Sequence, residues 1–181
     1  ILAFALSMYM ISVQRGVAIT SLLDFSFPTV ISALFFIPIQ GPMGEESGWR
    51  GYLLPAIESK VGVVKGCLVV SLIWSLWHAP IWFLGAGYSG AVLVQYIIVY
   101  FICIASVGFL IGICYHHCNN LIVPIWIHFW LNFCGQVFTG SRLELVSWYA
   151  AFYFVIAVGF FLWHRASHVP GKETAALRTV S

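Results

Sequence analysis

The sequence predicts an all-α fold: a polytopic membrane helix bundle with a polar cavity at membrane depth. Of its 181 residues, 61% are hydrophobic and only 8% are charged, whereas about 25% of the residues of an ordinary soluble domain are charged. The apolar residues form long runs separated by short polar segments, which is the pattern of membrane-spanning helices. A few charges lie inside these runs, and such charges need partners or water. They therefore predict the cavity.

Five complete hydrophobic segments and one partial segment follow from the apolar runs. Residues 1–13 are too short to span a bilayer, which takes about 20 residues, so we expect an excised fragment that lacks N-terminal helices. Gly41-Pro42 predicts a bend, or two helices end to end, in the first complete segment. The third segment carries no charge and is expected to be scaffold or lipid-facing. The complete segments cover residues 27–54, 62–84, 91–114, 120–138 and 145–163.

The stretch from Gly41 to Gly51 holds three of the fourteen charged residues. Glu46 and Arg50 have i,i+4 spacing, at which a carboxylate and a guanidinium meet on one helix face. Glu45 lies about 100° around the helix from this pair and has no local cation. Two interpretations follow: one structural ion network of all three, or a structural pair of Glu46 and Arg50 with Glu45 free to act as a base.

Four glycines in the same stretch form a smooth stripe along one side of the helix. Small residues in such a stripe let a second helix approach closely. Glu45 lies at the edge of the stripe, so we expect it to face a crevice between helices. The glycines are Gly41, Gly44, Gly48 and Gly51.

Two other segments contribute polar side chains one helical turn apart, namely Trp74 with His78 and His128 with Asn132. Two chemistries stay open. In one, Glu45 and His78 hold and deprotonate a water while His128 and Asn132 donate to an oxyanion. In the other, Glu45 and the two histidines bind a zinc ion that activates the water. No cofactor is the first expectation, with zinc as the alternative.

The depths of these residues are a difficulty for a single site. Counted from the nearest turns, Glu45, His78 and His128 lie about 20, 24 and 12 Å into their segments at 1.5 Å per residue. The breaks at Gly41-Pro42 and at Pro80 must bring the three levels together if they form one site.

Charge and cysteine content set further expectations. The net charge is +2, with no basic run, which argues against a nucleic-acid partner. The five cysteines lie in or next to apolar runs without a C-x-x-C pair and are expected to be buried free thiols. More lysines and arginines lie in the 55–65 turn and the C-terminal tail than in the loops on the opposite side. The turn and the tail are therefore expected to be cytoplasmic, with the cavity opening to the cytoplasm.

Taken in order, Glu45-Glu46-x-x-x-Arg50, Trp74-x-x-x-His78 and His128-x-x-x-Asn132 resemble the CPBP family of intramembrane proteases, also called the type II CAAX prenyl endopeptidase and bacteriocin-processing family. Trp74 stands where phenylalanine is common. The resemblance covers about residues 27–138, which we take as the core. Residues 1–26 then form a partial helix and loop, 139–164 the last membrane helix, and 165–181 a cytoplasmic tail.

The resemblance implies a helical intramembrane endopeptidase that acts on membrane-associated proteins or peptides. Glu45 and His78 would hold the water, His128 and Asn132 would bind the oxyanion, and Glu46 and Arg50 would support them. Its bacterial members suggest a multi-pass protein of a bacterial plasma membrane, in contact with lipid. The alternative is a non-catalytic bacteriocin-immunity or interaction protein that uses the same fold. A transporter is a third possibility, but no internal repeat supports it.

Overall fold

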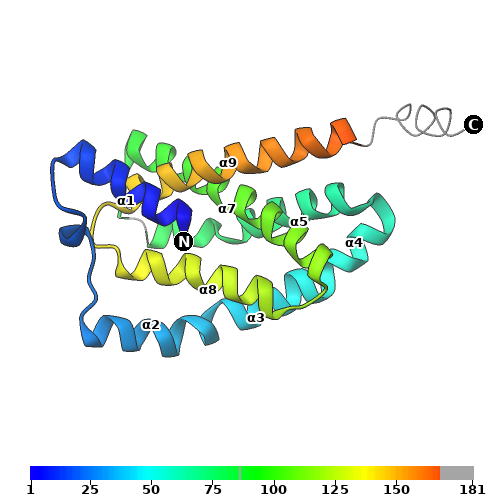
Figure 1. Cartoon of the computed structure of the whole chain (residues 1–181), viewed down its shortest axis with the longest axis horizontal. Helices are drawn as coiled ribbons and strands as arrows, with labels where there is room; N and C mark the ends of the chain where they lie inside the picture. The colour runs from blue at the N-terminus through cyan, green and yellow to red at the C-terminus, as the bar shows by residue number, and fades with distance from the viewer. Residues whose placement is uncertain (86, 168–181) are drawn as a thin grey trace, which may run out of the picture.

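The computed structural model describes residues 1–85 and 87–167, which form a bundle of helices (Figure 1). Four helical segments are long and apolar enough to cross a membrane, and α8 is a shorter apolar helix. With α1 they account for the five complete segments and the partial one, so the predicted all-α membrane bundle is confirmed. The elements are α1 (Leu2–Arg15), η1 (Ile19–Leu22), α2 (Phe27–Gln40), α3 (Pro42–Gly48), η2 (Trp49–Leu53, a π-helical turn), α4 (Leu54–Val61), α5 (Val63–Trp77), α6 (Ala79–Leu84), α7 (Gly90–Cys118), α8 (Ile122–Val137) and α9 (Arg142–Ser167).

Helix α7 is the central helix, and it packs between α5 and α9. Two of its glycines allow the close approach to α5: an added Cβ at Gly108 would lie 2.9 Å from the Trp74 ring, and one at Gly112 would lie 3.0 Å from the sulfur of Cys67. This packing agrees with the scaffold alternative of the prediction. The lipid-facing alternative stays a prediction, and Val92, Val94 and Ile98 near the start of α7 are exposed.

The glycine stripe of residues 41–51 has its predicted role at two of its four positions: an added Cβ at Gly51 would lie 3.2 Å from Leu121, and one at Gly41 would lie 3.5 Å from Asn132. An added Cβ at Gly44 or Gly48 meets no described atom within 4 Å. These two glycines border an open groove of about 520 Å³ that Trp49, Tyr52 and Trp77 also line.

The break at Gly41 is present as predicted. Helix α2 ends at Gln40, Gly41 has φ −138° and ψ −76°, and α3 begins at Pro42. Because Pro42 has no N–H and its ring excludes the preceding helical turn, a straight helix cannot continue through it. The break turns α3 toward α8, with which it is in contact.

A short polar turn before α2 lies outside the membrane-spanning segments. The Asp24 carboxylate accepts hydrogen bonds from the Thr29 hydroxyl at 2.6 Å and from the Ser26 backbone N–H at 2.9 Å. These bonds, that of Thr29 first, hold the pKa of Asp24 below its ordinary value. They stabilise the ionised carboxylate at the start of α2.

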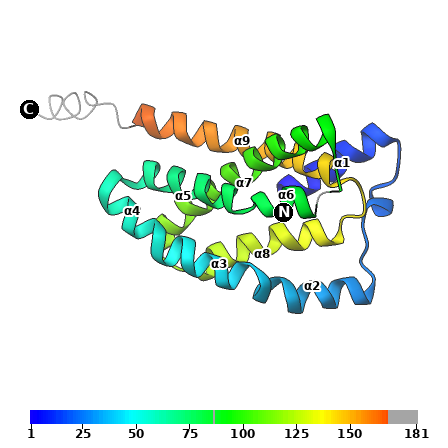
Figure 2. The same cartoon turned by 180° about the vertical axis from the view of Figure 1, so that it is seen from behind.

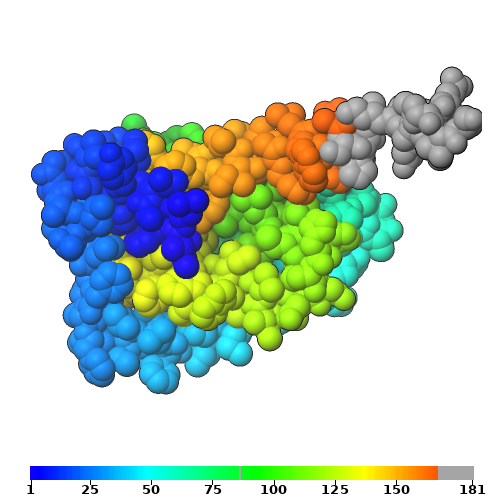
Figure 3. Space-filling model, viewed as in Figure 1, coloured from blue at the N-terminus to red at the C-terminus, as the bar shows by residue number. Residues whose placement is uncertain are grey.

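The antiparallel helices give the bundle two distinct ends. At one end, which we call the Arg142 end, lie the start of α7, the end of α8 and the start of α9. At the other, the Lys60 end, lie the α4–α5 turn, the α7–α8 turn and the C-terminal end of α9, as both views show (Figures 1 and 2). The space-filling view shows α1 and the start of α2 together at the Arg142 end (Figure 3).

The cysteines divide between core and surface. Cys67, Cys103 and Cys134 are buried free thiols, as predicted, but Cys114 and Cys118 are exposed. The prediction failed at these two because both lie in the last turns of α7, which extend past the neighbouring helices toward the Lys60 end. The predicted tail lies almost wholly outside the described residues.

Candidate active site

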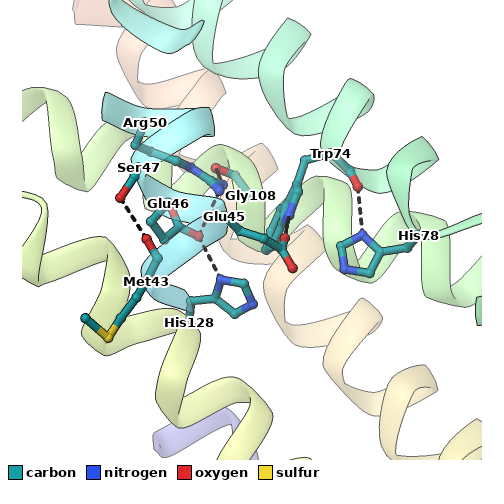
Figure 4. Close-up of polar contacts among 9 residues, drawn as sticks. All are labelled: Met43, Glu45, Glu46, Ser47, Arg50, Trp74, His78, Gly108 and His128. Carbon is teal, nitrogen blue, oxygen red and sulfur yellow. Dashed lines mark hydrogen bonds and ion pairs between the residues drawn. The ribbon is translucent and has the colours of Figure 1, made fainter. Parts of the chain in front are cut away.

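The indole of Trp74 lies at the centre of the polar cluster (Figure 4). It is fully buried and packs on Ile104, Val107 and Ile111 of α7. Its ring centroid lies 5.3 Å from that of His78 and 5.1 Å from that of His128, both edge-to-face. One aromatic side chain from α5 therefore separates and orients the two histidines.

Glu46 and Arg50 form the predicted ion pair, and its surroundings are fully buried. Arg50 Nη1 donates to Glu46 Oε1 at 3.0 Å, and neither side chain is exposed. Arg50 Nη2 donates to the Gly108 carbonyl of α7 at 3.1 Å, and the guanidinium lies 4.5 Å from the Trp74 ring centroid. The arginine thus ties η2 to α7 and to α5.

Glu46 also fixes the orientation of His128. The same Oε1 that receives Arg50 accepts a hydrogen bond from His128 Nδ1 at 2.8 Å. Because Nδ1 carries that proton, Nε2 is left to face the cavity. Nε2 donates to a substrate oxygen only when the ring is doubly protonated.

Glu45 is held differently from Glu46. Its Oε2 accepts the Trp74 indole N–H at 2.6 Å, and within the described part of the chain it makes no ion pair. A methyl group at Gly41 would lie 3.5 Å from Glu45 Oε1, 3.5 Å from Asn132 Nδ2 and 3.9 Å from His128 Nε2. Three polar atoms from two elements therefore surround one small space beside Gly41.

His78 lies at the junction of α5 and α6. It ends α5 with φ −79° and ψ −1°, and Pro80 follows in the first turn of α6. Its Nδ1–H donates to the Trp74 carbonyl at 2.7 Å, the carbonyl one turn earlier that the break leaves without its helical partner. This fixes the tautomer, so Nε2 carries a lone pair and can accept a proton or a hydrogen bond.

A cavity of about 440 Å³ contains all four candidate catalytic residues. It lies in the half of the bundle toward the Arg142 end, since it reaches Tyr96 near the start of α7 and Arg142 at the start of α9. Its lining therefore extends toward the end of the bundle opposite the C-terminal end of α9. The predicted cytoplasmic opening of the cavity stays a prediction. The other polar residues along its wall are Gln40, Tyr100, Gln136 and Tyr149.

The structure thus brings together the residues that the sequence placed at different depths. The breaks at Gly41 and His78 shift Glu45 and His78 to the level of His128, and the contacts with Trp74 join them. Sequence reasoning did not predict the hydrogen bond from the Trp74 indole to Glu45. The i,i+4 spacing of Trp74 and His78 places both side chains on one helix face, and this was a signal that Trp74 lies at the site. Sequence reasoning also missed Gln136, which continues the spacing of His128 and Asn132 by one more turn.

The alternative zinc ligand set of Glu45, His78 and His128 stays a prediction. The described residues contain no group of three or more His, Cys, Asp or Glu placed to hold a metal ion. One oxygen of Glu45 and the Nδ1 atom of each histidine are engaged in hydrogen bonds, which leaves Glu45 Oε1 and both Nε2 atoms with their lone pairs. No step below depends on a metal.

Comparison with known proteins identifies the family of the chain. Residues 14–134 match the model of the family described as type II CAAX prenyl endopeptidase Rce1-like, a range that includes every candidate site residue. CAAX prenyl protease 2 of Methanococcus maripaludis is 30% identical over 112 residues, which are 60% of this chain and 41% of that relative. The chain thus spans about two fifths of the length of this relative. It belongs to the type II CAAX prenyl endopeptidase Rce1-like family of membrane endopeptidases.

Proposed function

We propose that this protein hydrolyses a peptide bond in a membrane-associated protein or peptide, with Glu45 as general base. The observation that carries the proposal is the division of labour between the two glutamates. Glu46 Oε1 accepts from both Arg50 and His128 and Glu46 does not line the cavity, whereas Glu45 uses one oxygen for Trp74 and presents the other to the cavity. Of the two glutamates, Glu45 alone lines the cavity beside the oxyanion donors.

In this mechanism a water molecule lies between Glu45 Oε1 and His78 Nε2. Glu45 removes a proton as the water oxygen attacks the substrate carbonyl carbon, forming a C–O bond and placing negative charge on the carbonyl oxygen. The tetrahedral intermediate then collapses and the C–N bond breaks. Glu45 returns the proton to the leaving amine, so that the carboxylate is regenerated.

Asn132 and His128 would stabilise the negative charge. Within the described residues the Asn132 amide has no hydrogen-bond partner, so its Nδ2 hydrogens are available to a substrate oxygen. His128 Nε2 lies on the same side of the cavity and donates when the ring is doubly protonated, while its Nδ1–H donates to Glu46 Oε1. Each such donor contributes roughly 2.7–4 kcal/mol to transition-state stabilisation.

The Trp74 indole would position the base. Its short hydrogen bond to Oε2 fixes the carboxylate plane and leaves Oε1 for the water. Phenylalanine at this position would keep the ring packing but could not donate. We therefore assign Trp74 a positioning role in this chain.

The test is cleavage by the purified full-length protein in proteoliposomes that contain membrane proteins of its own host. New peptide termini are identified by N-terminal labelling and mass spectrometry. We expect them with the unmodified protein and with Glu58→Gln, a matched carboxylate outside the cavity, but not with Glu45→Gln.

Cleavage that survives Glu45→Gln would refute the role of Glu45. An absence of new termini from the unmodified protein would favour the non-catalytic immunity or interaction alternative. Adding a chelator or zinc to the unmodified protein tests the metal-dependent route.

We further propose a plasma-membrane protein, of bacterial type, with a cytoplasmic C-terminus. The Lys60 end carries the larger share of basic residues, and such ends face the cytoplasm. Exposed Cys118 reports on the Lys60 end, so an impermeant maleimide should label it in inside-out vesicles only. A Ser141→Cys variant made in a Cys118→Ser background should show the reverse pattern.

A further inference from the structure

A second hollow, on the outer face of the bundle, has no part in the proposed reaction. It is a groove of about 340 Å³ that runs along α7, with α5 on one side and α9 on the other, and Figure 1 shows α7 between these two helices. Apart from Ser106, the described side chains that line it are apolar. None of them also lines the cavity of the candidate active site.

The groove exists because small side chains form its floor and large ones form its rims. Ala105 and Ser106 of α7 and Ala157 of α9 leave space above the floor. On the rims, Leu68 of α5 is 45% exposed and Phe154 of α9 is 51% exposed. A continuous apolar surface of this kind in a membrane protein is suited to a hydrocarbon chain.

Two cations continue the two rims beyond the groove, at the Lys60 end. On α5, Lys65 precedes Leu68 by three residues, so both lie on one helix face. On α9, the guanidinium of Arg165 lies 5.9 Å from the ring centroid of Phe161, which lines the groove. Both cations are exposed, and within residues 1–85 and 87–167 neither makes a hydrogen bond or an ion pair. The mouth of the groove therefore carries two positive charges that no described side chain neutralises.

The length of the groove matches the depth of one membrane leaflet. Phe154 is the lining residue of α9 that lies furthest from Arg165. The rise of α9 between these two residues is about 16 Å at 1.5 Å per residue, which is about half of the 30 Å hydrocarbon thickness of a bilayer. A molecule in the groove would thus have its head beside the two cations and its tail end near the middle of the membrane.

We propose that this groove binds a phospholipid with a net negative headgroup. Its acyl chain lies on α7 between α5 and α9, and its phosphate accepts charge-assisted hydrogen bonds from Lys65 and Arg165. A zwitterionic headgroup brings a cation of its own to a mouth that already carries two, so a net negative headgroup binds better. The Lys60 end is also the proposed cytoplasmic end, and the cytoplasmic leaflet is the one that carries anionic lipids.

Native mass spectrometry of the full chain, released from detergent, tests this site. Phosphatidylglycerol and phosphatidylcholine with identical acyl chains are titrated separately, and the fraction of protein with one bound lipid gives each dissociation constant. We expect phosphatidylglycerol to bind about tenfold more tightly than phosphatidylcholine. In the double variant Lys65→Gln/Arg165→Gln this preference should fall to about twofold or less. Both replaced side chains are exposed, so this variant should fold.

Matched variants separate the headgroup contacts from the groove. Lys60→Gln removes a charge at the same end, outside the groove, and should leave the preference unchanged. Ala105→Leu fills part of the floor and should weaken the binding of both lipids by about tenfold, because it displaces part of the acyl chain. Ala151→Leu makes the same change at an exposed position of α9 outside the groove and should leave both affinities unchanged. Melting temperatures verify that each variant is folded; if Ala105→Leu is not, the charge variants still decide.

The proposal is overturned if the two lipids bind equally, if neither binds, or if the preference survives in Lys65→Gln/Arg165→Gln. Unchanged affinities in a folded Ala105→Leu protein would overturn it as well. A mass of two chains that Ala105→Leu converts to one would assign the groove to a second copy of the protein, against the proposal. None of these measurements involves cleavage, so the lipid site is tested independently of the hydrolase function.

Discussion

Replacing Glu46 by glutamine should destabilise the protein far more than the same change at the adjacent Glu45. Glu46 is fully buried and its Oε1 receives both Arg50 and His128. Glutamine keeps the shape but removes the charge, which leaves the Arg50 cation buried without compensation. Removing one partner of a buried ion pair costs about 3–5 kcal/mol.

The loss of stability expected for Glu45→Gln is smaller because the environment of Glu45 is different. Glu45 is half-buried and accepts one hydrogen bond, from Trp74. The amide oxygen of glutamine can accept the same bond, so the net change is about 1 kcal/mol or less. For a protein of this size 1 kcal/mol corresponds to about 2–4 °C in melting temperature. We expect a loss of about 6–20 °C for Glu46→Gln and of at most about 4 °C for Glu45→Gln.

A double variant tests the electrostatic reasoning directly. Glu46 Oε2 and Arg50 Nε are buried and have no hydrogen-bond partner among the described residues, so the pair does not recover its full desolvation cost. Glu46→Gln combined with Arg50→Met removes both charges and should melt at a higher temperature than Glu46→Gln alone. Intrinsic tryptophan fluorescence during heating in detergent gives all four melting temperatures. Equal losses of melting temperature for Glu45→Gln and Glu46→Gln, or additive losses in the double variant, would refute the assignment of Glu46 to the structural ion pair and of Glu45 to the general base.

Three further predictions follow from single positions. Gly41→Ala puts a methyl group 3.5–3.9 Å from three site atoms, so the protein should fold but lose about 100-fold in cleavage rate, whereas Gly44→Ala, which faces open space, should retain it. Gly108→Ala places a Cβ 2.9 Å from the Trp74 ring and should cost about 1–3 kcal/mol by overpacking, seen as a lower melting temperature. The pKa of Asp24 is lowered in the folded state, so its contribution to stability is present at neutral pH and is lost as pH falls through that pKa; in Asp24→Asn, the fall in melting temperature below about pH 4 should be shallower.

The fold was predictable because hydrophobicity and charge act locally. Apolar runs set the number of helices, and Gly41-Pro42 set the break between α2 and α3, since proline excludes a helical hydrogen bond wherever it occurs. The pairing of Glu46 with Arg50 was predictable for the same reason: both residues lie on one helix at a fixed spacing. Each of these inferences needs only residues that are close in sequence.

The features that were mispredicted depend on contacts between distant segments. The glycine stripe of residues 41–51 satisfied the pattern for helix packing, yet Gly44 and Gly48 face open space while Gly41 and Gly51 lie beside residues of the α8 segment, because only the tertiary arrangement decides which small residues meet a partner. The indole bond from Trp74 to Glu45 joins residues 29 positions apart.

The arrangement of the cluster also bears on the interpretation that all three charged residues of α3 and η2 form one structural network. Glu45 makes no ion pair within the described residues: Arg50 stacks on the Trp74 ring, and the indole N–H of the same ring donates to Glu45. Glu45 is therefore linked to the ion pair of Glu46 and Arg50 through Trp74 and not by a direct hydrogen bond. Glu46, in contrast, cannot be purely structural, because the oxygen that pairs with Arg50 also orients His128. A Glu46 variant rescued in stability by a change at Arg50 should therefore remain impaired in catalysis, since the second change restores the charge balance but not the orientation of the His128 ring.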